Sequence, residues 1–101
     1  MIDEIREKIA NGVFEYSIHA VDQSIDRHIS VQELREAIEK SEIIEDYPDD
    51  KYGPSCLISG FSSERRPLHI QCSYPSRNIL KIITIYEPDP ELWIDHKIRK
   101  Q

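Results

Sequence analysis

The sequence contains few glycines, few cysteines and no long apolar run. Its three glycines, Gly12, Gly53 and Gly60, are scattered, which excludes a glycine-rich phosphate-binding loop. Its two cysteines, Cys56 and Cys72, each lie in an apolar strand-like run without zinc-ligand spacing, so we expect two reduced, buried thiols. No stretch approaches the roughly 20 apolar residues that a membrane helix needs. These absences argue against an enzyme with a glycine-rich phosphate-binding loop, against a zinc site made by the cysteines and against a membrane-spanning helix.

A basic excess is also missing, because the formal net charge is −6. Proteins that bind nucleic acid by neutralising phosphates generally present a basic face, so the charge argues against such a partner. Most acids lie between Asp3 and Asp50, however, and a local basic patch is compatible with the later stretch that carries Arg65, Arg66, Arg77 and Lys81. Residues 1–8 are charged and amphipathic and lack the apolar region of a signal peptide. We therefore predict a cytoplasmic protein.

Length and hydrophobic periodicity indicate one domain over residues 1–101. A chain of 101 residues has room for one modest core, and its 39% hydrophobic and 32% charged residues are ordinary for a globular protein. Apolar residues recur at helical spacing in the first half and at strand spacing in the second. This order predicts an α+β fold, with N-terminal helices packed on a three- to four-stranded, mainly antiparallel meander sheet and a short C-terminal helix.

Three helices are predicted, over residues 3–11, 18–27 and 30–40. Ser17 is expected to cap the second helix, and Ser30 and Glu33 have the spacing of a capping box at the start of the third. The apolar stripes of the three helices are Ile2, Ile5 and Ile9; Ile18, Val21 and Ile25; and Val31, Leu34, Ala37 and Ile38.

Four strands are predicted, over residues 43–47, 56–61, 67–72 and 79–86, and a short extended segment precedes the second helix from Phe14. The last strand is rich in β-branched residues and apolar on both faces, so we expect it at the centre of the sheet. A short final helix is expected to start at Pro90, with Trp93 as a lid on the core and a basic tail from Lys97.

Two histidines are the first candidates for chemistry. His19 opens the second helix, where it shares one face with Gln23 and Arg27. His69 points to the opposite side of its strand from its apolar neighbours, and Tyr86 ends the most apolar strand, on the face of Thr84 and Ile82. An imidazole beside a guanidinium suits proton transfer or phosphate contact. Each of these residues could equally serve the structure, as part of a solvated helix face, as a hydrogen-bonded histidine or as a packed tyrosine.

A metal site is not indicated by these residues. A carboxylate together with His19 and His69 is the one arrangement that could be imagined, and no short-range pair of ligands supports it. We therefore expect no metal and no cofactor.

Short motifs follow one another over residues 16–94. They are His19-Ala20, Asp26-Arg27, Ile29-Ser30, Ile43-Ile44-Glu45, Tyr47-Pro48, Asp50, Pro54-Ser55-Cys56-Leu57, Gly60, Arg66-Pro67-Leu68-His69, Thr84-Ile85-Tyr86, Pro88-Asp89 and Trp93. Their order and spacing resemble a family of small bacterial and archaeal proteins described only as a domain of unknown function, number four-two-five-eight. The chain departs from the family pattern in two places: Asp26-Arg27-His28 replaces the usual Glu-Arg-Gly, and Ser24 stands where a basic residue is common.

The resemblance implies a toxin of a type II toxin–antitoxin pair. Members of the family look like such toxins, often encoded beside a zinc-finger antitoxin of the MqsA type, and by that association are similar to the RelE and MqsR messenger-RNA-cleaving toxins. The implied activity is metal-independent cleavage of mRNA, with or without the ribosome, and the implied partner is the antitoxin. The family's recurring polar positions are occupied by His19, Arg27, Arg66, His69 and Tyr86.

Roles for these five residues follow from the chemistry of RNA cleavage. The two histidines would act as base and acid in unassigned order, Arg27 and Arg66 would bind phosphate, and Tyr86 would orient the reacting groups. The alternative is a non-catalytic protein-binding module. In that case the same polar residues hold the helices against the sheet, with Arg27 paired to a carboxylate, and the acidic surface binds a basic partner.

Overall fold

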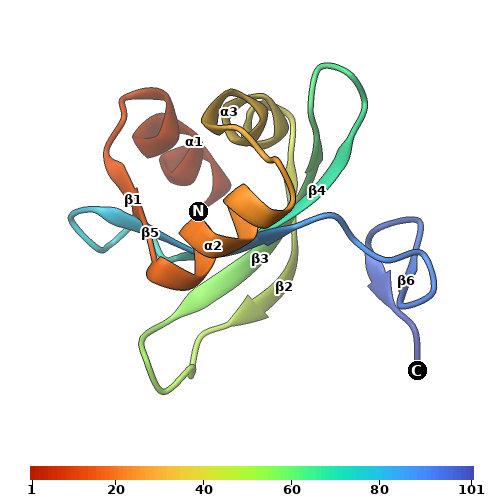
Figure 1. Ribbon diagram of the computed structural model, residues 1–101. Coiled ribbons are helices and arrows are strands. Elements are labelled where there is room, and N and C mark those ends of the chain that lie inside the picture. Colours follow the sequence, from red (N-terminus) through yellow and green to blue (C-terminus); the bar gives the residue numbers. More distant parts are fainter.

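Three helices pack against one face of a five-stranded sheet, and a small C-terminal hairpin lies away from them (Figure 1). The computed structural model describes all residues, 1–101. The elements are α1 (Ile2–Ala10), β1 (Phe14–Tyr16), α2 (Ile18–Asp26), α3 (Val31–Glu39), β2 (Glu42–Tyr47), β3 (Ser55–Phe61), β4 (Pro67–Ser73), β5 (Leu80–Tyr86), β6 (Trp93–Ile94) and β7 (Ile98–Arg99). None of the helices has the length and apolarity needed to cross a membrane. The predicted α+β class is confirmed.

The sheet has the strand order β1-β5-β4-β3-β2. Its four longer strands form the antiparallel meander that the sequence predicts. The count of three to four strands was too low, because β1 adds a fifth strand that runs parallel to β5 and pairs Phe14 with Leu80 and Tyr16 with Ile82. A segment of three residues is too short to show a strand period, and its partner lies far away in the sequence.

The central strand is β4, and the expectation that β5 is central was wrong. Beyond Ile82, the edge of β5 that faces away from β4 has no strand beside it, and Ser17 and α2 form hydrogen bonds to this edge instead. The Ser17 hydroxyl donates to the Ile83 carbonyl oxygen (2.8 Å), and the Ile85 N–H donates to the Gln23 side-chain oxygen (2.9 Å). The apolar composition of β5 therefore reflects burial against the helices rather than a place in the middle of the sheet.

A β-bulge at Ile83 changes which face the end of β5 presents. Thr84 pairs with Gln71, whereas Ile82 pairs with Cys72, so β5 has one residue more than β4 at this point. Ile82 consequently lies in the core, while Thr84 and Tyr86 lie on the sheet face opposite the helices, which we call the outer face. The simple alternation that grouped Tyr86 with Ile82 was wrong.

The core lies between the helices and the sheet. Its buried residues are Ile5, Ile9, Ala20, Ile29, Leu34, Ala37 and Ile38 from the helical half, and Cys56, Ile58, Leu68, Ile70, Cys72, Leu80, Ile82 and Ile85 from the strands. Cys56 and Cys72 face each other across β3 and β4 as free, buried thiols, as predicted. The caps at Ser17 and Ser30 are also confirmed, the second as a complete capping box with Glu33.

The apolar stripe of α2 is exposed. Ile18, Val21 and Ile25 are 84%, 40% and 65% exposed, because α2 turns Ala20 to the core and Gln23 to the β5 edge. In α3 the inner residues are buried as expected, except for Val31, which is 47% exposed. The exposed stripe on α2 has no partner within the chain.

The C-terminal segment forms a hairpin, so the predicted final helix was wrong. β6 and β7 pair antiparallel, and the turn between them holds Asp95 and His96 at positive φ angles of 51° and 61°, which a helix does not accommodate. Trp93 is buried, as expected of a lid, although it covers the outer face of the sheet rather than the core between sheet and helices.

Tyr16 allows a test of this packing. Its hydroxyl is buried and has no hydrogen-bond partner, and burial raises the pKa of this group. We expect Tyr16→Phe to leave the free energy of unfolding unchanged or to raise it by up to about 1 kcal/mol, because an unsatisfied buried hydroxyl is removed. Urea denaturation measures this, and a loss of more than about 1 kcal/mol would show that the hydroxyl has a stabilising partner.

Candidate functional site

His69 lies on the outer face of the sheet and is completely buried beneath the C-terminal hairpin. Its ring meets Trp93 edge-on at 4.5 Å between centroids, and its Nε2 lies 2.6 Å from the His96 carbonyl oxygen. Its Nδ1 lies 3.2 Å from the Tyr86 hydroxyl oxygen. Because a carbonyl oxygen only accepts, the hydrogen-bond network assigns the proton to Nε2. Nδ1 is therefore the free acceptor for the Tyr86 hydroxyl.

Burial keeps both members of this pair uncharged. It lowers the pKa of His69, against a smaller opposite effect of the hydrogen bond to His96. It also raises the pKa of Tyr86. A neutral imidazole with a free lone pair thus faces a neutral phenol, which is half-buried and lies nearer the solvent. This is an arrangement in which a proton can pass from the phenol to the imidazole.

A second polar group on the outer face was missed by the sequence analysis. Arg99 donates to both carboxylate oxygens of Glu45, from Nη2 at 2.9 Å and from Nε at 3.3 Å. Tyr47 donates to the same carboxylate. The bond from Arg99 lowers the pKa of Glu45, while burial and the carboxylate raise the pKa of Tyr47 to about 12. The two-residue spacing of Glu45 and Tyr47 could have placed them on one face, but Arg99 lies in a segment that was expected to be a basic tail after a helix.

Arg66 holds three parts of the chain together. Its Nε donates to Glu87, its Nη1 donates to Glu33 (3.1 Å) and to the His28 carbonyl oxygen (2.9 Å), and its Nη2 donates to the Arg27 carbonyl oxygen (2.7 Å). Every nitrogen of this guanidinium is engaged within the chain. The contacts fix the turn after α2 and leave no nitrogen of Arg66 without an acceptor.

His19 and Arg27 lie on either side of Gln23, one helical turn before and after it. Because Gln23 binds the β5 edge, this helix face runs beside the strand that ends in Tyr86. Both residues are exposed, and neither side chain makes a hydrogen bond or a salt bridge within the chain. The ion pair of Arg27 with a carboxylate, which the alternative reading expects, is not formed.

The structure thus brings together two subsets of the predicted residues. His69 contacts Tyr86, and Arg66 binds the backbone of Arg27, while His19 forms no hydrogen bond with any of the others. No group of three or more His, Cys, Asp or Glu side chains lies close enough to hold a metal ion.

The buried imidazole predicts a pH dependence of stability. The unfolded chain binds a proton at His69 near pH 6.5, and the folded protein binds it only at a lower pH. Between these values the unfolded state carries more protons, so the free energy of unfolding falls as the pH is lowered through 6.5. The measurement is urea denaturation at pH values from about 7.5 to about 5.5. This interval lies above the pH range in which carboxylates such as Glu45 titrate.

The matched control is His69→Gln, which retains a donor for the His96 carbonyl oxygen but cannot titrate. We expect the wild type to lose more stability than this variant over the same pH range. Equal losses in both proteins would show that the folded state does not disfavour protonation of His69.

A known protein family matches a segment of this chain that contains all five predicted site residues. A family model described as a domain of unknown function, DUF4258, matches residues 16–87, from the end of β1 through β5, and excludes α1 and the hairpin that covers His69. Searches of curated proteins and of solved structures found no match. Nothing in the comparisons links the chain to RelE or MqsR. The match covers well over half of the chain, which therefore belongs to the DUF4258 family.

Proposed function

We propose that the protein cleaves RNA without a metal ion and acts as the toxin of a type II toxin–antitoxin pair, similar in activity to RelE and MqsR. The observation that carries this proposal is the contact between the Tyr86 hydroxyl and Nδ1 of His69, whose other nitrogen is fixed by the His96 carbonyl oxygen. A base for RNA cleavage must be neutral before the reaction and must hold one tautomer. Both conditions hold for His69.

In the proposed reaction Tyr86 is the group that touches the substrate. The ribose 2′-hydroxyl donates its proton to the Tyr86 oxygen while the phenol proton passes to Nδ1 of His69. The 2′-oxygen attacks the adjacent phosphorus, and the bond from phosphorus to the 5′-oxygen breaks, which leaves a 2′,3′-cyclic phosphate. This relay lets a completely buried imidazole act as the base, because only the half-buried phenol must reach the RNA.

The remaining roles fall to exposed side chains of α2. Arg27 has a guanidinium free of internal partners, beside the end of β5, and we assign it to the phosphate. Arg66, whose nitrogens are all engaged, positions the Arg27 backbone. His19 is the second imidazole, and in this proposal it protonates the departing 5′-oxygen.

The test is cleavage of a single-stranded RNA by the purified protein in the presence of excess EDTA. We expect fragments that end in a 2′,3′-cyclic phosphate, and growth arrest when the gene is induced alone, relieved when the adjacent gene is induced with it. An RNA that stays intact both alone and on translating ribosomes would rule out the proposed reaction.

A second candidate function, a protein-binding module, is favoured by the exposed apolar stripe of Ile18, Val21 and Ile25 on α2. Asp22 and Asp26 flank this stripe, so the fitting partner is an apolar segment edged by basic residues, such as a segment of the antitoxin. Ile25→Asp should abolish binding of the adjacent gene product, and Ile79→Asp, on an exposed residue outside α2, should not. Equal binding by both variants would move the partner to another surface.

A further inference from the structure

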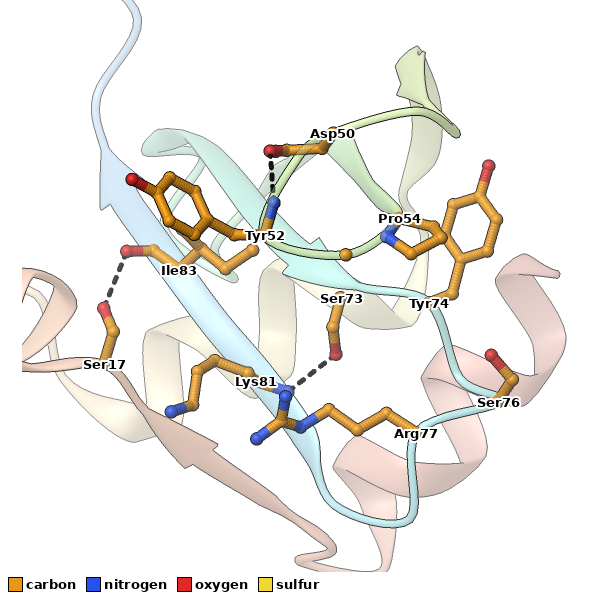
Figure 2. Close-up of a pocket in the computed structure, with 11 residues that line it drawn as sticks. Ser17, Asp50, Tyr52, Pro54, Ser73, Tyr74, Ser76, Arg77, Lys81 and Ile83 are labelled. Atoms are coloured by element: carbon orange, nitrogen blue, oxygen red, sulfur yellow. Dashed lines mark hydrogen bonds between the residues drawn. The ribbon is translucent and has the colours of Figure 1, made fainter.

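A cavity of about 470 Å³ opens beside the start of β5, between the loop that precedes β3 and the loop that joins β4 to β5. The residues that matter for its chemistry are Tyr52, Ser73, Arg77, Lys81 and Ile83. Figure 2 shows the side chains of Arg77 and Lys81 on one side of the cavity and the ring of Tyr52 on the other. Two cations and an aromatic ring thus line one opening.

The two cations are available to an anionic ligand. Arg77 and Lys81 each lie 3.5 Å from the same carboxylate, that of Glu15, and their side chains are 51% and 34% exposed. Exposed ion pairs of this length contribute little to stability, so a phosphate can replace the carboxylate at small cost. Lys8 donates to two carbonyl oxygens of the β4–β5 loop, both at 2.8 Å, and so holds Arg77 in place.

The other charged residue of the cavity is engaged in its own loop. Asp50 accepts hydrogen bonds from the Tyr52 N–H (3.2 Å) and from the Ser55 hydroxyl (3.3 Å). Its carboxylate therefore shapes the loop that presents the aromatic ring.

Tyr52 has no packing role that explains its position. Its side chain is 87% exposed, and Lys51 Nζ lies 4.9 Å from the centroid of its ring. An exposed ring beside cations is the combination with which proteins bind single-stranded nucleic acid: bases stack on the ring and phosphates meet the cations.

We propose that this cavity binds one nucleotide of a single-stranded RNA, with the base on Tyr52 and the phosphate on Arg77 and Lys81. This inference rests on the proposed RNA cleavage and adds where the substrate is held. Ser73, Gln71 and His69 alternate along the outer face of β4, so a strand of RNA leaving the cavity along β4 reaches the pair of His69 and Tyr86. The cavity is thereby a substrate subsite apart from the reacting groups.

The experiment measures binding separately from cleavage. A fluorescein-labelled single-stranded RNA with 2′-O-methyl groups throughout cannot be cleaved, because it lacks the attacking hydroxyl, and its binding is followed by fluorescence anisotropy at several salt concentrations. We expect the Arg77→Gln, Lys81→Gln double variant to weaken binding by at least about tenfold and to reduce the slope of log K against log salt by about 0.7, the value for the one phosphate that the two cations hold.

Tyr52→Ala should weaken binding by about tenfold, as expected for the loss of one stacked base, and should leave the salt slope unchanged. The control is Lys40→Gln, an exposed lysine at the end of α3 on the helical side of the molecule, which should bind like the wild type.

The outcomes separate this subsite from the proposed reaction. If the wild type cleaves ordinary RNA and the cavity variants bind and cleave equally well, the subsite is wrong while the reaction stands. If the variants lose binding but no protein cleaves RNA, the subsite stands and the reaction is wrong. A mononucleotide that binds as tightly as the oligonucleotide would also overturn the inference, because the ligand would then be a free nucleotide.

Discussion

Tyr86→Phe is expected to lower the rate of RNA cleavage by about a hundredfold or more and to abolish growth arrest on induction. The variant removes one oxygen, the atom that lies 3.2 Å from Nδ1 of His69 and that would take the proton of the 2′-hydroxyl. Without it the buried imidazole has no route to the substrate. The ring itself, which meets the His69 ring at 5.3 Å between centroids, is retained.

The control for this prediction is Tyr16→Phe, which also removes one phenol oxygen. Tyr16 lies on β1, which pairs with β5, the strand that holds Tyr86. This variant should leave the cleavage rate unchanged. The free energy of unfolding should fall by no more than about 1.5 kcal/mol in Tyr86→Phe, the usual contribution of one hydrogen bond. A correctly folded Tyr86→Phe protein that cleaves RNA within about threefold of the wild-type rate would exclude the relay, since loss of acid–base catalysis costs far more.

His69→Gln gives a second measurement of the same relay. If Tyr86 and His69 act as one unit, the double variant should be no slower than the slower of the two single variants, because residues that act together are not additive. If the rate losses of the two single variants multiply in the double variant, the two residues serve different steps.

Gly60→Ala is expected to cause the largest loss of stability, about 3 kcal/mol, which is at the upper end for an overpacked core. A Cβ at this position would lie 2.1 Å from the carbonyl oxygen of Ala37 and 2.9 Å from its carbonyl carbon. Both are backbone atoms of α3, so no side chain can rotate to make room, and β3 and α3 must separate.

The matched control is Gly12→Ala. Gly12 has a φ of 72°, and an added Cβ there would meet only the end of Arg35, at 3.9 Å. Its expected cost is about 1 kcal/mol, from the backbone conformation alone. Urea denaturation of both variants compares the two effects. Equal losses of stability in the two variants would mean that β3 at Gly60 does not lie as close to the Ala37 carbonyl group of α3 as the structure shows.

The parts of the fold that could be predicted are those specified by neighbouring residues. The caps at Ser17 and Ser30, the inner face of α3 and the antiparallel meander depend on spacings of two to four residues, which the sequence displays directly. The parallel pairing of β1 and the bulge at Ile83 depend on partners in other parts of the chain, and no local period reveals them. The C-terminal hairpin pairs locally, but its strands of two residues each are too short to show a strand period.

The same distinction applies to the candidate site. Strand alternation correctly placed His69 opposite its apolar neighbours, but only the register of β4 and β5 brings it to Tyr86. The sequence could not show that every nitrogen of the Arg66 guanidinium donates to a carbonyl oxygen or a carboxylate, because these acceptors come from three separate segments. It also could not show that the polar side of α2 binds a strand edge while its apolar side faces outward.

The parallel pairing of β1 with β5 sets the order in which the molecule can be completed during synthesis. Phe14 emerges early, but its partner Leu80 is made only after the whole meander. Contacts this far apart in the chain close slowly, and until they close α2 has no strand edge on which to dock. Before β5 is made, α2 therefore lacks the strand edge to which it docks, whereas α1 and α3 can already pack against each other and α3 against β3. The edge of β5 beside Tyr86 is among the last features to form, so a partly made chain would lack the strand end on which the proposed reaction depends.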